Sequence, residues 1–155
     1  MGTSVIDGTI EEVVLRRRRK LGSVYDRVVF RLDDGSTKTW GKSVVWNQVA
    51  DHLKPGLKGR FYLYTAIDHR GIHGIRTIDG REVFGLGKVN EIVALVLFVV
   101  NALVVALSTA TTGDAPLLSV ILLVLSIPMY ILYRGTRVQA ERQFHADAGF
   151  RPAAA

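Results

Sequence analysis

Residues Ile92 to Ser108 read IVALVLFVVNALVVALS, and residues Leu117 to Tyr133 read LLSVILLVLSIPMYILY. With their flanks, positions 89–110 and 115–133 form two apolar segments of about 20 residues each. As helices they span about 30 Å, which is the thickness of the hydrocarbon core of a bilayer. Asp114 is the one charged residue between positions 92 and 133. Segments this long and this free of charge predict two transmembrane helices.

The connection between the two segments, residues 111–114, is short, and short connections join antiparallel neighbours. It carries no Lys or Arg, whereas basic residues precede the first segment and follow the second: Arg81, Lys88, Arg134, Arg137 and Arg142. Because Lys and Arg collect on the cytoplasmic side of membrane proteins, we expect both termini to be cytoplasmic and the connection to be external. The pattern is typical of a bacterial-type inner membrane protein.

The composition excludes some kinds of chemistry. The chain has no cysteine, so it forms no disulfide, no thiolate metal site and no Cys nucleophile. Neither apolar segment contains Asp, Glu, Lys, Arg or His deep inside it, which argues against a proton relay or an ion pathway of its own. We expect no cofactor and no metal site.

Residues 1–88 show hydrophobic residues with a period of two, which is typical of strands. The expected order is three strands, a short helix, two strands and a further short strand. That is the order of an OB-like barrel, and an SH3-like barrel is the nearest alternative. The sequence therefore predicts a mainly β small barrel of five to six strands with one short helix, followed by an α-helical transmembrane hairpin. The predicted divisions are 1–88 for the cytoplasmic barrel, 89–110 and 115–133 for the helices, 111–114 for the external loop and 134–155 for a cytoplasmic tail.

Aromatic and basic residues alternate along the strands of the predicted barrel. If the inward and outward positions along these strands are assigned correctly, the outer surface carries Tyr25, Trp40, Tyr62 and Tyr64 beside Arg and Lys. Such a surface can stack bases and follow phosphates. A shift of one residue would place every one of these aromatic side chains in the core. We therefore expect nucleic acid to be an improbable partner.

The strongest local signal is the basic run Arg16, Arg17, Arg18, Arg19 and Lys20, at the end of the first strand and in the loop to the second. It could bind anionic lipid, which attracts basic residues near a membrane surface. It could also bind an acidic protein or nucleic acid, or it could be a solvated edge that prevents strand pairing. The lipid interpretation is favoured over nucleic acid because the barrel is expected to lie close to the membrane.

Two polar residues interrupt the apolar segments. Asn101 lies near the middle of the first, and Ser119 or Ser126 of the second could face it in an antiparallel hairpin. Polar side chains within a membrane require hydrogen-bond partners. We expect an intramembrane polar contact that is structural, either within the hairpin or between copies. A gating or substrate contact is the functional alternative.

Only Gly85, Leu86, Gly87 and Lys88 separate the last predicted strand from the first helix. We therefore predict a non-enzymatic scaffold in which the hairpin holds the barrel at the inner membrane surface, where the barrel recruits or braces a protein partner, a membrane complex or a second copy. The alternatives are a tethered barrel that binds anionic lipid or nucleic acid through its basic run, and an enzyme with an unrecognised site.

Overall fold

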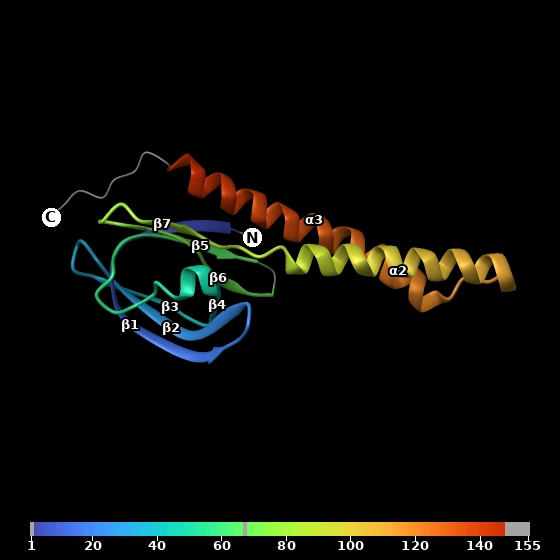
Figure 1. Ribbon diagram of the computed structural model, residues 1–155, viewed down its shortest axis with the longest axis horizontal. Coiled ribbons are helices and arrows are strands. Elements are labelled where there is room, and N and C mark those ends of the chain that lie inside the picture. The colour runs from blue at the N-terminus through green and yellow to red at the C-terminus, as the bar shows by residue number, and fades with distance from the viewer. Residues whose placement is uncertain (1, 67, 148–155) are drawn as a thin grey trace. The chain divides into compact units, whose positions relative to one another are not determined.

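The computed structural model describes residues 2–66 and 68–147. The chain divides into two compact units (Figure 1). The sheet unit contains the chain up to Leu86 together with residues from Val138 onward, and the hairpin unit contains residues Gly87–Arg137.

The sheet unit is mainly β, as the sequence predicts. Its elements in chain order are β1 Gly2–Arg18, β2 Gly22–Leu32, β3 Thr37–Trp40, β4 Ser43–Trp46, α1 Asn47–Ala50, β5 Lys58–Thr65, β6 Arg70–Thr77 and β7 Glu82–Phe84. The third predicted strand corresponds to β3, whereas β4 is an additional strand that the sequence did not predict; both of these pair with β2. The sheet therefore has seven strands and not five to six. Apart from β4, the predicted order of three strands, a helix and two strands with a short extra one is confirmed.

The strands pair in the order β3-β2-β1-β5-β6-β7, with β4 also on β2. The long β1 pairs with β5 along residues 2–9 and with β2 along residues 8–18. At the other side, β4 lies against β6, so close that a side chain at Gly71 would clash with the carbonyl oxygen of Val44. The sheet thus curls back on itself into the small OB-like barrel that the element order predicts.

Apolar side chains from alternate positions fill the barrel. Val28 and Phe30 of β2 and Phe61 and Leu63 of β5 are fully buried, and the rings of Phe30 and Phe61 lie 4.9 Å apart. Burial of each such side chain contributes about 1.5–3 kcal/mol, so this core accounts for most of the driving force for folding of the sheet unit.

The conditional surface of alternating aromatic and basic residues does not form. Tyr62 and Tyr64 of β5 lie on the face opposite Phe61 and Leu63, as the alternation predicts, but that face is covered, and Trp40 of β3 is partly buried against the core. Tyr25, Tyr62 and Tyr64 are all at least 95% buried. Residues 61–64 of β5 are buried on both faces. Phe61 and Leu63 line the barrel, whereas on the other face α3 covers Tyr62, and Tyr64 packs against His69 and His73. Phe144 of α3 packs edge-on against Tyr62, with ring centroids 5.0 Å apart.

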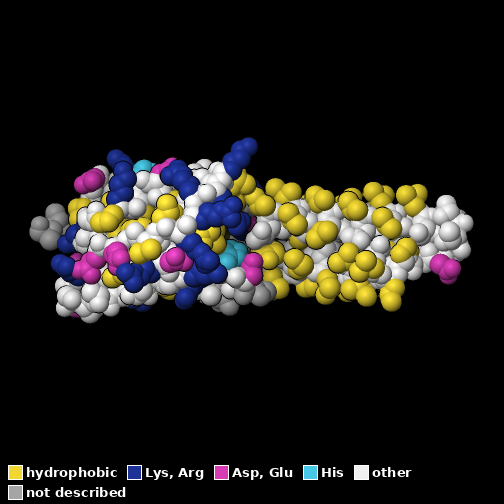
Figure 2. Space-filling model, turned by 90° about the horizontal axis from the view of Figure 1, so that it is seen from below, with side chains coloured by type: hydrophobic (Ala, Val, Ile, Leu, Met, Phe, Trp, Pro, Cys, Tyr) yellow, Lys and Arg dark blue, Asp and Glu magenta, His cyan; other side chains and the backbone are white. Residues whose placement is uncertain are grey.

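The hairpin unit consists of α2 Val89–Thr112 and most of α3 Leu117–Ala146. Both helices are long and apolar enough to cross a membrane. Figure 2 shows hydrophobic side chains over the visible surface of these helices, whereas Lys and Arg gather on the sheet unit. An ion pair between Glu91, in the first turn of α2, and Arg137 of α3 joins the two helices, which therefore run antiparallel.

The buried side of α2 is a narrow line of small and polar residues. Glu91, Ala94 and Asn101 are buried along it, while most Val and Leu side chains of α2 are exposed. A chain folding in water would bury the large apolar residues, whereas helices in lipid pack through small residues and direct the large ones outward. The pattern favours a lipid environment.

Residues after Tyr133 continue α3 to Ala146. Ala140 and Phe144, four residues apart on one side of the helix, are buried in the sheet unit. Phe144 can lie this close to β6 only because residue 74 is Gly: a Cβ atom at that position would be 2.6 Å from the Phe144 ring. The segment expected as a tail, residues 134–155, is therefore part of α3 as far as Ala146; residues 148–155 lie outside the described residues.

Candidate functional site

The basic run lies at one end of the sheet unit, where β1 passes into β2. Arg16, Arg17 and Arg18 are the last residues of β1, and Arg19 and Lys20 form the turn. All five are exposed. The register shifts between Val14 and Leu15 and again between Leu15 and Arg17, and such irregularities redirect the side chains of a strand. The structure thus brings together the five residues that the sequence marks as one cluster.

The turn is held by the side chain of Asn47, the first residue of α1. The Asn47 Nδ2 donates to the carbonyls of Arg19 (3.0 Å) and Lys20 (2.9 Å), and the Ser23 hydroxyl donates to Asn47 Oδ1 (3.1 Å). The Arg19 amide also donates to the Gly22 carbonyl (2.9 Å). Because the Asn47 side chain binds the Arg19 and Lys20 carbonyls on the inner side of the turn, the turn is ordered and its basic side chains are directed outward.

Beside this turn lies an open groove with a volume of about 700 Å³, here called the basic groove. Cross-strand pairing places Arg17 beside Val24, and Val24 beside Val44, on one face of the sheet. Gly22 pairs with Trp46 on the same face, and both residues line the groove. The floor of the basic groove is therefore apolar, and its rim is cationic: Arg16, Arg17, Arg19, Lys20 and Lys42.

The cations of the basic groove are only partly neutralised within the chain. Arg16 of the rim approaches Asp26 at 3.8 Å; Arg18 of the basic run, which does not line the groove, pairs with Asp51 at 2.7 Å. Across residues 2–66 and 68–147, no acidic side chain forms an ion pair with Arg17, Arg19, Lys20 or Lys42. A concentration of unneutralised positive charge attracts anionic ligands and partners.

An exposed leucine lies within the same surface. Leu21 follows the basic run, lines the basic groove and is 56% exposed. Within the described part of the sheet unit, Leu21 and Leu15 are the only large hydrophobic side chains that are exposed. The basic groove thus combines cations with accessible apolar surface, an arrangement suited to an anionic amphiphile or to an acidic segment with apolar side chains.

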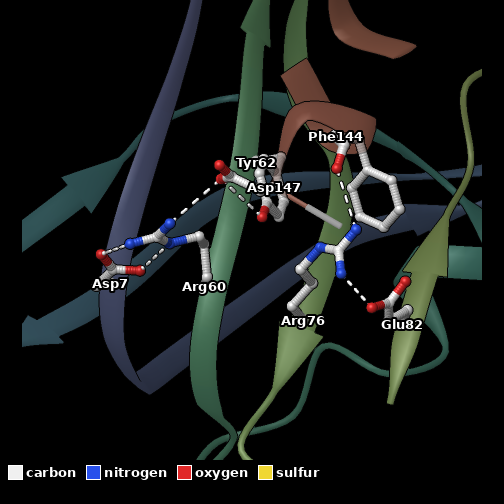
Figure 3. A network of polar contacts seen from close by, with 7 residues as sticks. All are labelled: Asp7, Arg60, Tyr62, Arg76, Glu82, Phe144 and Asp147. Atoms are coloured by element: carbon white, nitrogen blue, oxygen red, sulfur yellow. Dashed lines mark hydrogen bonds and ion pairs between the residues drawn. The ribbon is translucent and has the colours of Figure 1, made fainter. Parts of the chain in front are cut away.

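A second group of polar residues binds the end of α3 to the sheet (Figure 3). Asp147 accepts hydrogen bonds from Arg60 (3.2 Å) and from the Tyr62 hydroxyl (3.0 Å), and Arg60 also pairs with Asp7 of β1. Burial, reinforced by the adjacent Asp147, raises the pKa of Tyr62 to about 12. We call this set, together with Arg76, Glu82 and Phe144, the helix latch.

Arg76 is the most buried charge of the helix latch, with 2% of its side chain exposed. Its guanidinium pairs with Glu82 of β7 and donates to the Phe144 carbonyl at 3.1 Å. It also lies over the Phe144 ring, 4.5 Å from the centroid. A cation bound to a carbonyl in the last turn of a helix also offsets the negative end of the helix dipole, so Arg76 fixes the end of α3 by three interactions at once.

His73 of β6 lies under the same turns of α3. It is fully buried among Tyr62, Tyr64 and Phe84, and neither ring nitrogen has a hydrogen-bond partner among the described residues. Burial lowers the pKa of His73 to about 4, an effect partly offset by the nearby carbonyl of Ala140. The imidazole is therefore neutral near pH 7 and serves as a packing element.

The two intramembrane residues proposed from the sequence lie in the hairpin unit, apart from the basic run. Asn101 and Ser126 are both buried. The Asn101 amide donates to the Leu97 carbonyl (2.7 Å), and the Ser126 hydroxyl donates to the Leu123 carbonyl (2.6 Å). Each side chain thus has a partner in its own helix, and a direct contact between the two stays a prediction.

Several residues of the candidate site were not foreseen as part of it. Lys42 and Trp46 reach the basic groove only through the pairing of β4 with β2, which is not visible in local sequence. Asn47 is the first residue of α1, but α1 has no side-chain cap, and the Asn47 side chain binds the β1–β2 turn instead.

Comparisons with protein-family models, with curated proteins and with solved structures found no match for this chain.

Proposed function

We propose that this chain is a membrane-anchored, non-enzymatic scaffold. The hairpin unit inserts in the inner membrane, and the barrel is held at the cytoplasmic surface, where it recruits or braces a protein partner or a membrane complex. Both termini are cytoplasmic in this proposal, because the basic residues flank the hairpin and the connection between the helices has none.

The observation that carries the proposal is the double attachment of the sheet unit to the hairpin unit. The chain leaves the sheet unit through four residues between Phe84 and Val89, and it returns through α3, which continues unbroken from Leu117 to Ala146. The helix latch then binds the last turns of α3 to β5, β6 and β7. A domain that had only to remain near the membrane would need one flexible tether, whereas two short attachments favour a role in bracing.

The partner is tested with the full chain, purified in a mild detergent from its native membrane. A photo-crosslinking residue replaces Lys38 or Lys54 on the sheet unit, and a matched residue replaces Ala115 between the helices. The proposal expects one protein to be retained in stoichiometric amount and to crosslink from the sheet unit. The scaffold role would be contradicted by a chain that purifies alone, or by a catalytic activity that purifies with it.

A further inference from the structure

We propose that the basic groove is a lipid-docking surface, which binds anionic headgroups of the same bilayer that holds the hairpin, with Leu21 and Trp46 entering the headgroup region. The inference rests on membrane insertion of the hairpin, as proposed above, but it does not depend on a protein partner. It assigns the basic run to the membrane and leaves the remaining surface of the barrel for recruitment.

The chemistry of the basic groove matches a bilayer surface in both of its components. Arg17, Arg19, Lys20 and Lys42 have no acidic partner within the described ranges, so their charge is available to phosphate groups. Leu21 is 56% exposed, and Trp46 lies at the groove floor. Indole rings are favoured at the boundary between headgroups and acyl chains, and an apolar side chain flanked by cations gains from both parts of that boundary.

The ordered β1–β2 turn favours a binding role for the basic run over the alternative role of a solvated edge that prevents strand pairing. An edge that only repels other strands needs charge and no fixed loop. Here Asn47 binds the carbonyls of Arg19 and Lys20, and the Ser23 hydroxyl binds Asn47. Since the turn is already fixed before binding, little conformational entropy is lost when it meets a surface.

Because the connection between β7 and α2 is short, the bilayer is the ligand nearest to the basic groove. Four residues, Gly85 to Lys88, lie between β7 and α2, and four residues extend over at most about 14 Å. A surface on a barrel that is tied this closely meets the bilayer at a high effective concentration. A soluble anion or an acidic protein must instead bind from solution, so lipid is the favoured occupant.

The test uses the two tryptophans as depth probes in the full chain. Trp40→Phe leaves Trp46 in the basic groove as the only tryptophan. Trp46→Phe leaves Trp40, which packs against the barrel core and serves as the matched control. Each variant is placed in nanodiscs of phosphatidylcholine, with or without phosphatidylglycerol, and quenching by brominated lipid is measured. We expect Trp46 to be quenched in discs that contain phosphatidylglycerol, and Trp40 to be unaffected.

Replacing three cations in the Trp46 probe, Arg17→Gln, Arg19→Gln and Lys20→Gln, should lower the ratio of docked to undocked barrels on the order of a hundredfold. High salt should act in the same direction. The inference is overturned if Trp46 is quenched no more than Trp40, or if quenching survives the loss of the three cations. It is also overturned if only polyglutamate or an oligonucleotide protects Trp46 from a water-soluble quencher. Because the hairpin anchors the chain in every sample, a negative result leaves the scaffold proposal standing.

Discussion

Asn47 makes a connection that determines the shape of the basic groove. Its side chain joins α1 to the β1–β2 turn, 27 and 28 residues earlier in the chain, through two carbonyls. The backbone amide of Asn47 adds a weaker bond to the Leu21 carbonyl at 3.3 Å. A single amide side chain thus converts a run of mutually repelling cations into an ordered turn.

Replacing Asn47 by Ala removes these side-chain bonds without changing the charge of the basic groove. We expect the sheet unit to lose about 1–2 kcal/mol of unfolding free energy, because each lost hydrogen bond contributes roughly 0.5–1.5 kcal/mol and the exposed carbonyls can bind water. Hydrogen exchange should accelerate at residues 19–22 more than elsewhere. Gln48→Ala, at an exposed neighbouring position, is the control, and equal exchange in the two variants would contradict the role of Asn47.

His73 makes the sheet unit sensitive to acid. The imidazole is held neutral by burial, with a pKa of about 4 against 6.5 for the free group. Below pH 6.5 the unfolded chain therefore takes up a proton that the folded chain refuses, so stability is complete above pH 6.5 and declines as the pH falls toward 4. The free energy of unfolding falls by an amount on the order of 3 kcal/mol, because each unit of difference between the two pKa values corresponds to about 1.4 kcal/mol.

The measurement is the thermal midpoint of the full chain in detergent at pH 7, 6, 5 and 4, compared with that of His73→Phe. Phenylalanine keeps an aromatic ring among Tyr62, Tyr64 and Phe84 and cannot be protonated. We expect the variant to lose most of the decline between pH 6.5 and 4. A parallel decline in both proteins would show that groups other than His73 cause the acid sensitivity.

At the scale of elements, the end of α3 acts as an additional layer on the barrel. Phe144 lies against Tyr62 and Phe84, and its carbonyl accepts from the buried Arg76. Asp147, Arg60 and Asp7 extend the contact to β5 and β1. The layer therefore depends on a buried aromatic ring surrounded by charged hydrogen bonds, and the ring contributes most of the buried area.

Phe144→Ala should release this layer. Truncation of a buried Phe costs about 3–5 kcal/mol, and here it also uncovers the faces of β5 and β6 under α3. We expect faster hydrogen exchange at residues 138–147 and a lower thermal midpoint, with the hairpin unit unchanged. Arg142→Ala, at an exposed position of the same helix, should have little effect. Unchanged protection of residues 138–147 in Phe144→Ala would mean that the ion pairs alone hold the end of α3.

The elements show which parts of the fold can be predicted from sequence. The apolar helices are evident because their signal is local, and the strand order follows from turns such as Asp33 to Ser36. The two faces of β5 follow from the alternation of its residues, since Phe61 and Leu63 belong to the barrel core. The burial of the opposite face is not predictable locally, because Phe61 to Tyr64 are all buried. The cover over β5 comes from residues some 80 positions later, as the bond between Tyr62 and Asp147 illustrates.

The candidate site, too, can be predicted only in part from local sequence. The basic run is visible in the sequence because its five residues are contiguous. Its apolar floor is not, because Val24, Val44 and Trp46 come from β2 and β4 and are united by cross-strand pairing. The spacing of Ala140 and Phe144 places both on one face of a helix and indicates that this face is buried, as it is in the helix latch. The spacing does not identify the surface that the helix covers.

At the scale of the whole molecule, both proposals depend on the side of the membrane on which the sheet unit lies. The lipid-docking inference requires the sheet unit to face the leaflet that carries anionic lipid, and the positive residues around the hairpin favour that orientation. The absence of cysteine allows orientation to be measured without background, because any single introduced thiol is the only one present.

Ala115→Cys places a thiol in the connection between α2 and α3, and Asp79→Cys places one in the turn between β6 and β7; both positions are exposed. In intact cells, a membrane-impermeant maleimide should label Cys at 115 and should reach Cys at 79 only after permeabilisation. The cysteine-free chain is the control for unspecific labelling. The opposite pattern would place the barrel outside, and both the inner-surface scaffold and docking on the cytoplasmic leaflet would then be excluded, because the basic groove would face a different membrane surface.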